Sequence, residues 1–239
     1  MLAGISAEYY LRLEQGRDRN PSLQVLESLA RVLQLDDEMS AYLLGLAAEK
    51  PRTLRRRPRK ETVPASTARL VASLPFPAFI EGRYLDVLAA NPLAAAISPR
   101  MAVGHNRLRD VFLDPGERAL FAHWERAAAG LVAGFRQSVG TETDDPRFVE
   151  LVGELTIASP LFAQLWARHD VAPRTGARMM FDHPQVGELV VDREKLGIPG
   201  TDGMMLVIYH AEPGTEGADK LAMLASSVLS AVRTTHSPA

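Results

Sequence analysis

The first fifty residues follow the spacing of helices, with apolar side chains recurring every three or four positions. Residues 6–15 are predicted to form a short helix, because the Ser6 hydroxyl can accept from free first-turn amides and Gly16 can end a helix in the left-handed conformation. Asn20 is predicted to cap a second helix that Pro21 opens, since the missing amide hydrogen of proline costs nothing at that position. This part of the chain is therefore predicted to be all helical.

The second and third predicted helices each collect their apolar residues on one face. In the second helix these residues are Leu23, Leu26, Ala30 and Leu33. The third helix follows the acidic cap Asp36-Asp37, and its apolar face is formed by Met39, Tyr42, Leu43 and Leu46.

A basic stretch punctuated by prolines follows at residues 50–61. It cannot bury an apolar face, so we expect a linker here. The chain is thereby divided into an N-terminal domain at residues 1–49 and a larger domain at residues 62–239.

Beyond the linker, helix and strand patterns are mixed. Strands are predicted at 76–80 and 84–89, with a tight glycine turn at Glu81-Gly82-Arg83 between them, and at 178–182, 188–192 and 204–210. The same cap-then-proline device opens helices at Asn91-Pro92, at Asp114-Pro115 (running to about Ser138), at Asp145-Pro146 and at Ser159-Pro160, and a last helix covers 217–232. This order predicts an α+β fold, an antiparallel sheet with helices gathered on one face.

Composition narrows the functions open to such a chain. Its 46% of apolar residues are enough for a core in each domain. The absence of cysteine excludes disulfides, thiolate zinc sites and cysteine nucleophiles. No apolar run approaches the roughly 20 residues of a membrane span, and we find no signal peptide after Met1. We expect a cytoplasmic protein with no membrane partner.

The net charge of −2 conceals an asymmetry along the chain. Residues 1–60 contain 11 lysines and arginines against 8 acidic residues, whereas the remainder contains 16 against 21. Only the front of the chain is suited to binding a polyanion. The excess is too small to establish nucleic-acid binding by itself.

Motifs in the front domain add to this picture. They are Ala3-Gly4-Ile5-Ser6, Tyr9-Tyr10-x-Arg12-Leu13-Glu14-x-Gly16, Asn20-Pro21-Ser22 and Leu26-x-x-Leu29-Ala30-x-x-Leu33. Together they resemble the turn, the recognition helix and the next helix of Xre-type, lambda-repressor-like helix-turn-helix domains. Such a helix enters the major groove with its N-terminal residues, and the resemblance makes Tyr10 and Leu13 the buried pair on its back.

The resemblance implies a DNA-facing surface formed by Ser6, Ala7, Glu8, Arg12, Arg17 and Arg19. Glu8 can accept from the amino group of cytosine, and Arg12 can bond guanine or a phosphate. Arg17 and Arg19 are placed for phosphate contacts that carry no sequence information. The alternative is that these are ordinary solvated charges on a small helical bundle.

The helix-turn-helix pattern in this chain is shorter than the family pattern. The chain starts at the turn before the recognition helix, so the family's first helix and nearly all of its second are missing. Each core side chain lost from such a small bundle costs about 2–5 kcal/mol. We expect either a truncated product or a start codon placed too late, with DNA as a partner if the domain is completed upstream.

Motifs across the larger domain also match one family in order. They are Pro75-x-Pro77-Ala78, Asp86-Val87-Leu88-Ala89-Ala90-Asn91-Pro92-Leu93, Asp145-Pro146-Arg147, Leu151-Val152-Gly153-Glu154-Leu155, Ser159-Pro160-x-Phe162, Leu165-Trp166-Ala167-Arg168-His169-Asp170-Val171, His183-Pro184-x-Val186-Gly187 and Glu212-Pro213-Gly214. They resemble the ligand-binding domain of MmyB-like transcription regulators. The resemblance implies a Per-Arnt-Sim-like fold behind an Xre-type domain and a fatty-acid-like ligand in the interior.

Large side chains of this domain could line an apolar cavity, with hydroxyl or indole hydrogens as polar contacts. They are Tyr84, Trp124, Phe135, Phe162, Trp166 and Tyr209. For any one of them, simple core packing is the alternative. Two polar residues join the candidate ligand site: Asn91, whose other role is a helix cap, and Arg147, whose alternative is a surface ion pair.

The pairs His169-Asp170 and Asp182-His183 invite a metal interpretation, but their spacing matches no helical pair of ligands. We expect structural histidines that bond backbone or carboxylate groups instead. No nucleophile-base arrangement, phosphate-binding loop or dinucleotide motif is present, so we expect no enzyme and no cofactor.

The leading hypothesis is a homodimeric transcription regulator whose sensing domain binds a small apolar acid and biases DNA binding. The runner-up is a ligand-binding or partner-binding protein with no DNA contact.

Overall fold

The computed structural model describes residues 5–18, 21–47, 61–140, 145–168 and 176–235. The chain separates into two compact units. One comprises residues 1–59 with 140–143, and the other residues 60–139 with 144–239. Each unit is described by itself.

The first unit contains the helices α1 (Ala7–Glu14), α2 (Leu23–Val32) and α3 (Asp37–Ala47). Both predicted ends of α1 are confirmed. The Ser6 hydroxyl accepts from the Tyr9 amide at 3.1 Å, and Gly16 has a φ of 64° just beyond the helix.

The predicted start of α2 is wrong by two residues. Ser22, not Asn20, caps the helix, because its hydroxyl accepts from the Val25 amide, and Pro21 lies before the cap. Asn20 itself lies outside the described residues. A serine hydroxyl at this position satisfies one of the free first-turn amides as well as asparagine would.

The second unit is built on an antiparallel sheet with the strand order β2-β1-β5-β4-β3. The strands are β1 (Ala78–Glu81), β2 (Val87–Ala90), β3 (Ala177–His183), β4 (Gly187–Gly197) and β5 (Met205–His210). The predicted α+β class is confirmed, with the antiparallel sheet and helices that the Per-Arnt-Sim-like resemblance implied.

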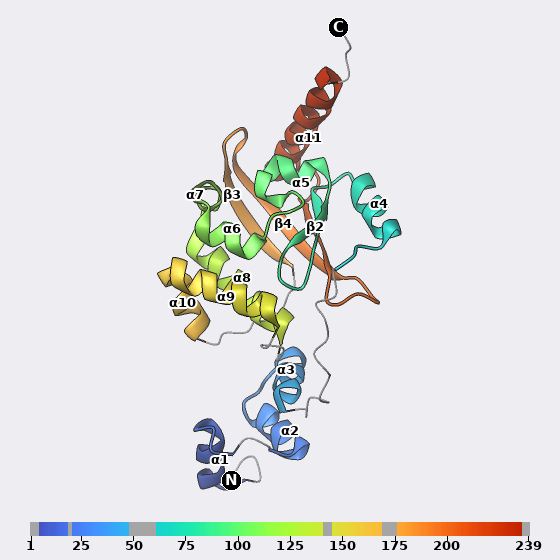
Figure 1. The fold of residues 1–239 in the computed structure, drawn as a ribbon. Helices are drawn as coiled ribbons and strands as arrows, with labels where there is room; N and C mark the ends of the chain where they lie inside the picture. Colours follow the sequence, from blue (N-terminus) through green and yellow to red (C-terminus); the bar gives the residue numbers. More distant parts are fainter. Residues whose placement is uncertain (1–4, 19–20, 48–60, 141–144, 169–175, 236–239) are drawn as a thin grey trace. The chain divides into compact units, whose positions relative to one another are not determined.

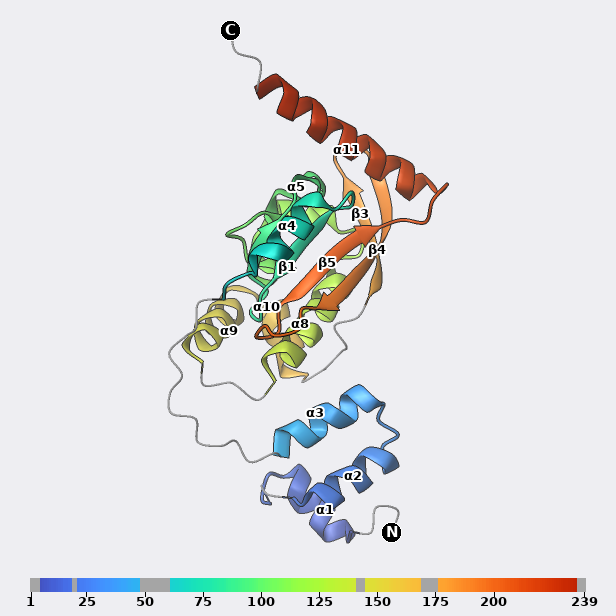
Figure 2. The ribbon, with the colours of Figure 1, turned by 90° about the vertical axis from the view of Figure 1, so that its right-hand side faces the viewer.

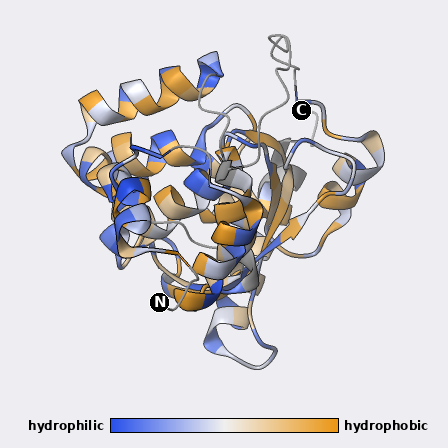
Figure 3. Cartoon of the chain, turned by 90° about the horizontal axis from the view of Figure 1, so that it is seen from below, coloured by the Kyte–Doolittle hydropathy of each residue, from blue (hydrophilic) through white to orange (hydrophobic). Residues whose placement is uncertain are grey.

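Helices surround this sheet (Figure 1). They are α4 (Ala65–Ser73), α5 (Pro92–Ile97), α6 (Arg107–Leu113), α7 (Pro115–Leu120), α8 (Trp124–Val139), α9 (Pro146–Ala158), α10 (Pro160–Ala167) and α11 (Glu216–Thr235), with a short 3-10 helix at Pro99–Met101. Apolar and polar residues alternate along them, as Figure 3 shows, so that each helix can bury one side.

Alternation along the strands creates two cores. The larger one lies between α5 to α10 and the sheet face that carries Phe79, Phe181 and Tyr209. The smaller one lies on the opposite face, where Ile80 meets Val71 of α4. Figure 2 shows α4 lying across β1, and the sequence did not predict this helix. The prediction that the helices gather on one face of the sheet is therefore wrong, because α4 packs on the other face.

The long helix predicted from Asp114-Pro115 to about Ser138 is wrong. It is two helices, α7 and α8, separated at Phe121, Ala122 and His123. The break arises because the chain pairs with the sheet there: Phe121 forms an antiparallel bridge with Phe181, and the Ala122 amide donates to the Met180 carbonyl at 3.3 Å. Strand pairing therefore overrides the helical pattern.

The strand predicted at 84–89 begins later than expected, at Val87. Its first residues belong to the turn instead, where the Leu85 amide donates to the Gly82 carbonyl. Leu85 has a φ of 63°, a left-handed conformation that is costly for a residue with a side chain. It is held there by burial, with only 1% of its surface exposed.

Candidate functional site

Helix α1 presents the predicted DNA-facing residues to solvent. Ser6, Ala7, Glu8 and Arg12 are all exposed, and Glu8 lies 3.6 Å from Arg12 in an ion pair one turn apart. Both groups stay accessible to a partner, because exposed pairs of this kind contribute only a few tenths of a kcal/mol.

The back of α1 differs from the prediction. Tyr10 and Leu13, expected to be buried, are half-buried, and α1 has no fully buried residue. Arg17 is exposed just past the helix, as a phosphate contact requires. Arg19 lies outside the described residues.

A charged cavity of about 30 Å³ lies inside the second unit, between the sheet, α6 and α8. Its apolar lining is formed by Phe79, Val111, Phe121, Ala127, Leu131, Met179 and Val207. Its polar lining is formed by Glu81, Arg107, Arg193, Lys195 and Tyr209. Four charged side chains around so small a space are unusual in a protein interior, where charges are normally paired or absent.

Sheet register places these polar groups together. Arg193 of β4 is directly opposite Tyr209 of β5, and Lys195 is opposite Val207. Side chains two residues apart on a strand share a face, so Arg193 and Lys195 both lie on the face of the larger core. Glu81 of β1 completes the group from the other side of β5.

Two of the three cations are neutralised by buried carboxylates. Lys195 Nζ lies 2.6 Å from Glu81 Oε1, with 7% and 2% of the two side chains exposed. Arg107 is bonded to Glu117, whose other oxygen accepts from Ser98. Burial is the largest single influence on the pKa of Arg107 and would lower it, but Glu117, Tyr209 and Asp110 together raise this pKa above its usual value.

Arg193 differs from the other two cations. Within the described part of the chain, its buried Nε has no hydrogen-bond partner. Its neighbour Tyr209 is buried, and burial raises the pKa of the phenol despite the opposing effect of Arg193 and Arg107. The Tyr209 hydroxyl therefore stays protonated and can donate a hydrogen bond.

One of the aromatic residues predicted to contact a ligand borders the cavity, and others pack in the core. Tyr209 borders the cavity. Phe135, Phe162 and Trp166 pack on one another in the core, with the Phe162 and Trp166 rings stacked at 5.8 Å. Tyr84 is also part of this core. A ligand contact by the residues away from the cavity stays a prediction.

Asn91 has the capping role given as its alternative. Its Oδ1 accepts from the amides of Ala94 and Ala78, and its Nδ2 donates to backbone carbonyls. These carbonyls belong to Val71, Leu74 and Phe76. One side chain thereby joins α4, β1 and α5.

Arg147 and His183 also have local partners. Arg147 Nη2 lies 3.1 Å from Asp86 and Nη1 lies 3.3 Å from Glu150, the ion pairs that the sequence offered as its alternative role. His183 Nε2 is bonded to the Ala96 carbonyl at 2.9 Å, and its Nδ1 accepts from the Gln185 amide. The structural role predicted for this histidine is confirmed.

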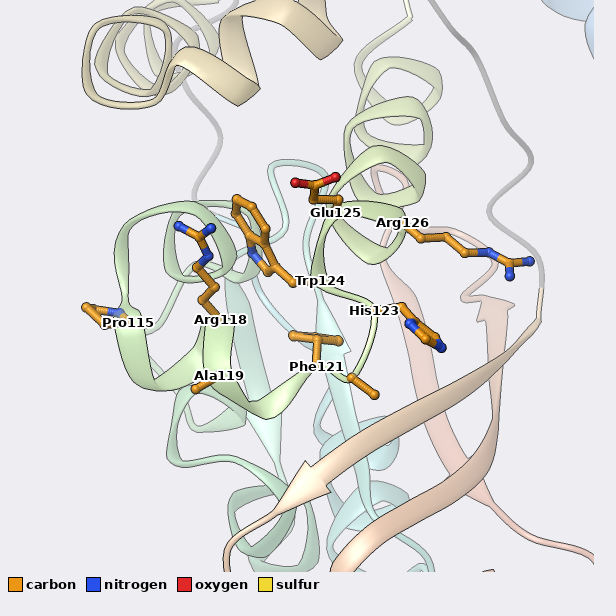
Figure 4. Close-up of a pocket in the computed structure, with 9 residues that line it drawn as sticks. Pro115, Arg118, Ala119, Phe121, His123, Trp124, Glu125 and Arg126 are labelled. Carbon is orange, nitrogen blue, oxygen red and sulfur yellow. The ribbon is translucent and has the colours of Figure 1, made fainter.

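A surface hollow lies outside the break between α7 and α8 (Figure 4). There the Arg118 guanidinium lies 3.8 Å from the centre of the Trp124 ring, and the Trp124 indole donates to the Val111 carbonyl at 2.8 Å. Phe121 lines both this hollow and the internal cavity.

No cluster of potential metal ligands occurs among the residues that the structure describes. Within the same part of the chain, no helix has the length and apolarity to cross a membrane.

The sequence did not identify the charged residues of the cavity, although one signal was present. The strand predicted at 188–192 continues to Gly197, and continued alternation from Leu189 and Val191 places Arg193 and Lys195 on the buried face. A strand extended by five residues would have brought both cations into the candidate site.

The described fold defines a two-part protein, a unit of short helices and an α+β domain with a charged internal cavity. Residues 63–224 match the family model of the MmyB-like transcription regulator ligand binding domain. Residues 1–43 match that of a helix-turn-helix domain. Since the first match covers more than half of the chain, the chain belongs to the MmyB-like transcription regulators, and it is a ligand-responsive regulator with a helix-turn-helix. Together the two matches point to a DNA-binding regulatory protein. No curated protein matches it.

Proposed function

We propose that this chain regulates transcription as a cytoplasmic homodimer of the Xre type, and that its ligand is a fatty-acid-like small molecule held beside the sheet. The charged cavity is the observation that carries the proposal. It joins apolar walls to cations and a phenolic donor, which is the combination that an apolar acid requires.

The location of this cavity supports a sensing role. Its floor is the sheet, and its cover is formed by α6 through Val111 and by α8 through Ala127 and Leu131. A molecule entering here would bear on both helices. A ligand shifts a protein between states only when it binds them with different affinity, and a cavity that must change shape to be filled provides that difference.

The DNA-reading part of the proposal rests on α1. Its exposed Glu8 and Arg12 have the chemistry to read cytosine and guanine edges, and Arg17 can contact phosphate. A second copy of the chain would present the same helix to a second half-site, as helix-turn-helix dimers do.

Native mass spectrometry of the purified full chain tests the ligand. We expect an additional mass that is lost on denaturation and that extracts into organic solvent as an acid. Protein purified through a delipidating resin serves as the matched control. A chain that carries no such mass, and that takes up none from a fatty-acid mixture, would contradict the fatty-acid proposal.

Selection of binding sites from a randomised DNA pool at low salt tests the other half. We expect enriched duplexes with two related half-sites, and a complex with two copies of the chain. No enrichment, together with a retained ligand, would favour the runner-up, a ligand-binding protein that does not contact DNA. The observation that favours this runner-up is that Tyr10 and Leu13, on the back of α1, are only half-buried.

A further inference from the structure

We propose that the exposed side of α11 is the surface through which two copies of this chain associate, with the two helices antiparallel about a twofold axis at Ser226. The proposal rests on the homodimer of the proposed function and deepens it, because it assigns the surface that the second copy occupies.

Helix α11 is attached to its domain by one side. Leu224 is 3% exposed and belongs to the larger core, and Leu221 packs against the same core. The Lys220 ammonium donates to the Glu188 carbonyl of β4. In Figure 1 the second half of α11 extends beyond α5 and the sheet.

The opposite side of α11 carries apolar and small residues. At helical spacing they form an outer stripe made up of Ala222, Met223, Ser226, Leu229 and Ser230, all of them exposed. The two large apolar members, Met223 and Leu229, are 61% and 64% exposed. No charged residue occurs in the sequence from 221 to 232, whereas the solvent side of a helix normally carries charges.

The two serines do not prevent this stripe from losing its water. Ser226 Oγ donates to the Ala222 carbonyl at 2.9 Å, and Ser230 Oγ donates to the Ser226 carbonyl at 3.0 Å. Each hydroxyl hydrogen is therefore used within the helix. A second helix can cover the stripe without leaving a hydroxyl donor unpaired.

The order of residues along the stripe makes it complementary to itself. Met223 and Leu229 lie three residues before and after Ser226, and Ala222 and Ser230 lie four residues before and after it. A twofold axis through Ser226 brings each residue of the first half opposite its counterpart in the second copy. Met223 of one copy then packs on Leu229 of the other, and the small side chains between them let the helices approach closely.

Charges at the two ends of the stripe favour a second copy in the antiparallel direction. The sequence has an aspartate seven residues before Ser226, Asp219, and an arginine seven residues after it, Arg233. Antiparallel pairing brings the acidic position of each copy opposite the basic position of the other, so opposite charges meet at both ends of the contact. Parallel pairing would bring like charges together.

The length of the contact sets the strength of the dimer. Residues 219–233 of α11 span about 21 Å at roughly 1.5 Å per residue. Two helices in contact over that length bury less than the roughly 1,600 Å² of a standard interface. We therefore expect a reversible dimer with a dissociation constant of about 1 µM or weaker. Two DNA half-sites on one duplex strengthen such a dimer, because they hold both copies close together.

Sedimentation velocity of the full chain from about 0.1 to 100 µM, on both sides of that constant, tests the interface. We expect the wild-type chain to pass from monomer to dimer. Leu229→Glu should weaken the dimer by at least about tenfold, because it places a charge inside the contact. Ile157→Glu is the matched control and should leave the dimer unchanged, since Ile157 is 90% exposed on α9. Both variants should unfold at the temperature of the wild-type chain, because both positions are exposed.

Cross-linking tests the direction of the helices. The chain contains no cysteine, so an introduced cysteine is its only thiol. A mixture of Met223→Cys and Leu229→Cys chains, treated with a short bis-maleimide, should give cross-linked dimers, whereas each variant alone should give few. Cross-linking of each variant alone and not across the mixture would show a parallel contact and would overturn the twofold axis at Ser226.

A wild-type chain that stays monomeric up to the highest concentration would overturn the α11 interface. Equal effects of Leu229→Glu and Ile157→Glu on the dimer would overturn it as well. Selection of DNA sites judges the proposed function separately, because copies that associate through another surface still give complexes with two copies on one duplex.

Discussion

Glu61 Oε1 accepts a hydrogen bond from the backbone amide of Arg83 at 2.8 Å. The Arg83 guanidinium in turn donates to the carbonyls of Ser138 at 3.3 Å and Val139 at 2.7 Å, at the end of α8. Glu61, the last residue of the predicted linker, is thereby connected through one turn to the end of α8, a helix that lines the cavity. These hydrogen bonds hold Glu61, the turn and the end of α8 together.

The Glu61 carboxylate lies against Gly82, where a side chain would meet it. A Cβ at Gly82 would come within 2.2 Å of Glu61 Oε2. We expect Gly82→Ala to displace the carboxylate and to cost about 1 kcal/mol, the value of the lost hydrogen bond. Urea unfolding of a double-mutant cycle with Glu61→Ala checks this: in the Glu61→Ala background the glycine substitution should cost almost nothing. An equal cost in both backgrounds would show that Gly82 is needed for another reason.

Stability should depend on pH through the same carboxylate. Burial raises the pKa of Glu61, opposed by the hydrogen bond from Arg83, and Asp86 and Asp202 act in the same direction as burial. A carboxyl group whose pKa is higher in the folded state binds its proton more tightly there, so it destabilises the fold as pH rises from the unfolded pKa through the folded one. Glu61→Gln should therefore gain stability relative to wild type across that window and match it below. Thermal unfolding from pH 4 to pH 7 measures the difference, and a difference that shrinks as pH rises would contradict it.

Asn91 should be among the most sensitive positions in the domain. Its replacement by alanine removes a helix cap and leaves buried backbone groups, among them the Ala78 amide, without a partner. Caps contribute about 1 kcal/mol and unsatisfied buried groups about 1–3 kcal/mol, so we expect a loss of about 3 kcal/mol. Ser73→Ala, which loses only one exposed hydrogen bond, should cost under about 0.5 kcal/mol in the same denaturation assay. Similar losses for the two variants would show that the Asn91 bonds are not the main connection between α4, β1 and α5.

The two arginines near α1 should affect DNA binding differently. Arg12→Gln should cost about 1–3 kcal/mol and relax selectivity at one base position, whereas Arg17→Gln should weaken all sequences alike and reduce the salt slope by about 1. Fluorescence anisotropy on selected duplexes at several salt concentrations separates these effects. Arg69→Gln, an exposed arginine on α4, is the control. Identical behaviour of the Arg12 and Arg17 variants would indicate only phosphate contacts.

The sequence predicted the helix starts that depend on a capping side chain next to the helix. The caps Ser6, Asn91, Asp114, Asp145 and Ser159 all accept from amides of the helices that they begin. The missed helix α6 has the same kind of signal, since Asn106 accepts from the Arg109 amide. Helix α4 has none, because Pro64 at its start offers no side-chain acceptor.

The features that escaped prediction depend on contacts distant in sequence. Nothing near Phe121 signals a helix break, since the break exists only because β3 pairs with the chain there. In the sequence, Arg193 follows the predicted strand and resembles a solvated residue. In the structure, β4 continues beside β5 and places Arg193 opposite Tyr209. For the candidate ligand site, the sequence therefore predicted aromatic residues, of which Tyr209 borders the cavity. It did not predict the charged residues that line the same cavity.

The most direct test compares the DNA affinity of the full chain as purified with that of the same protein after delipidation, on one selected duplex at fixed salt. A ligand-responsive regulator should differ between the two states by a factor of about 5–150, the usual range of coupling between two sites. Equal affinity of the two preparations, when mass spectrometry confirms that only one carries a ligand, would contradict the central claim.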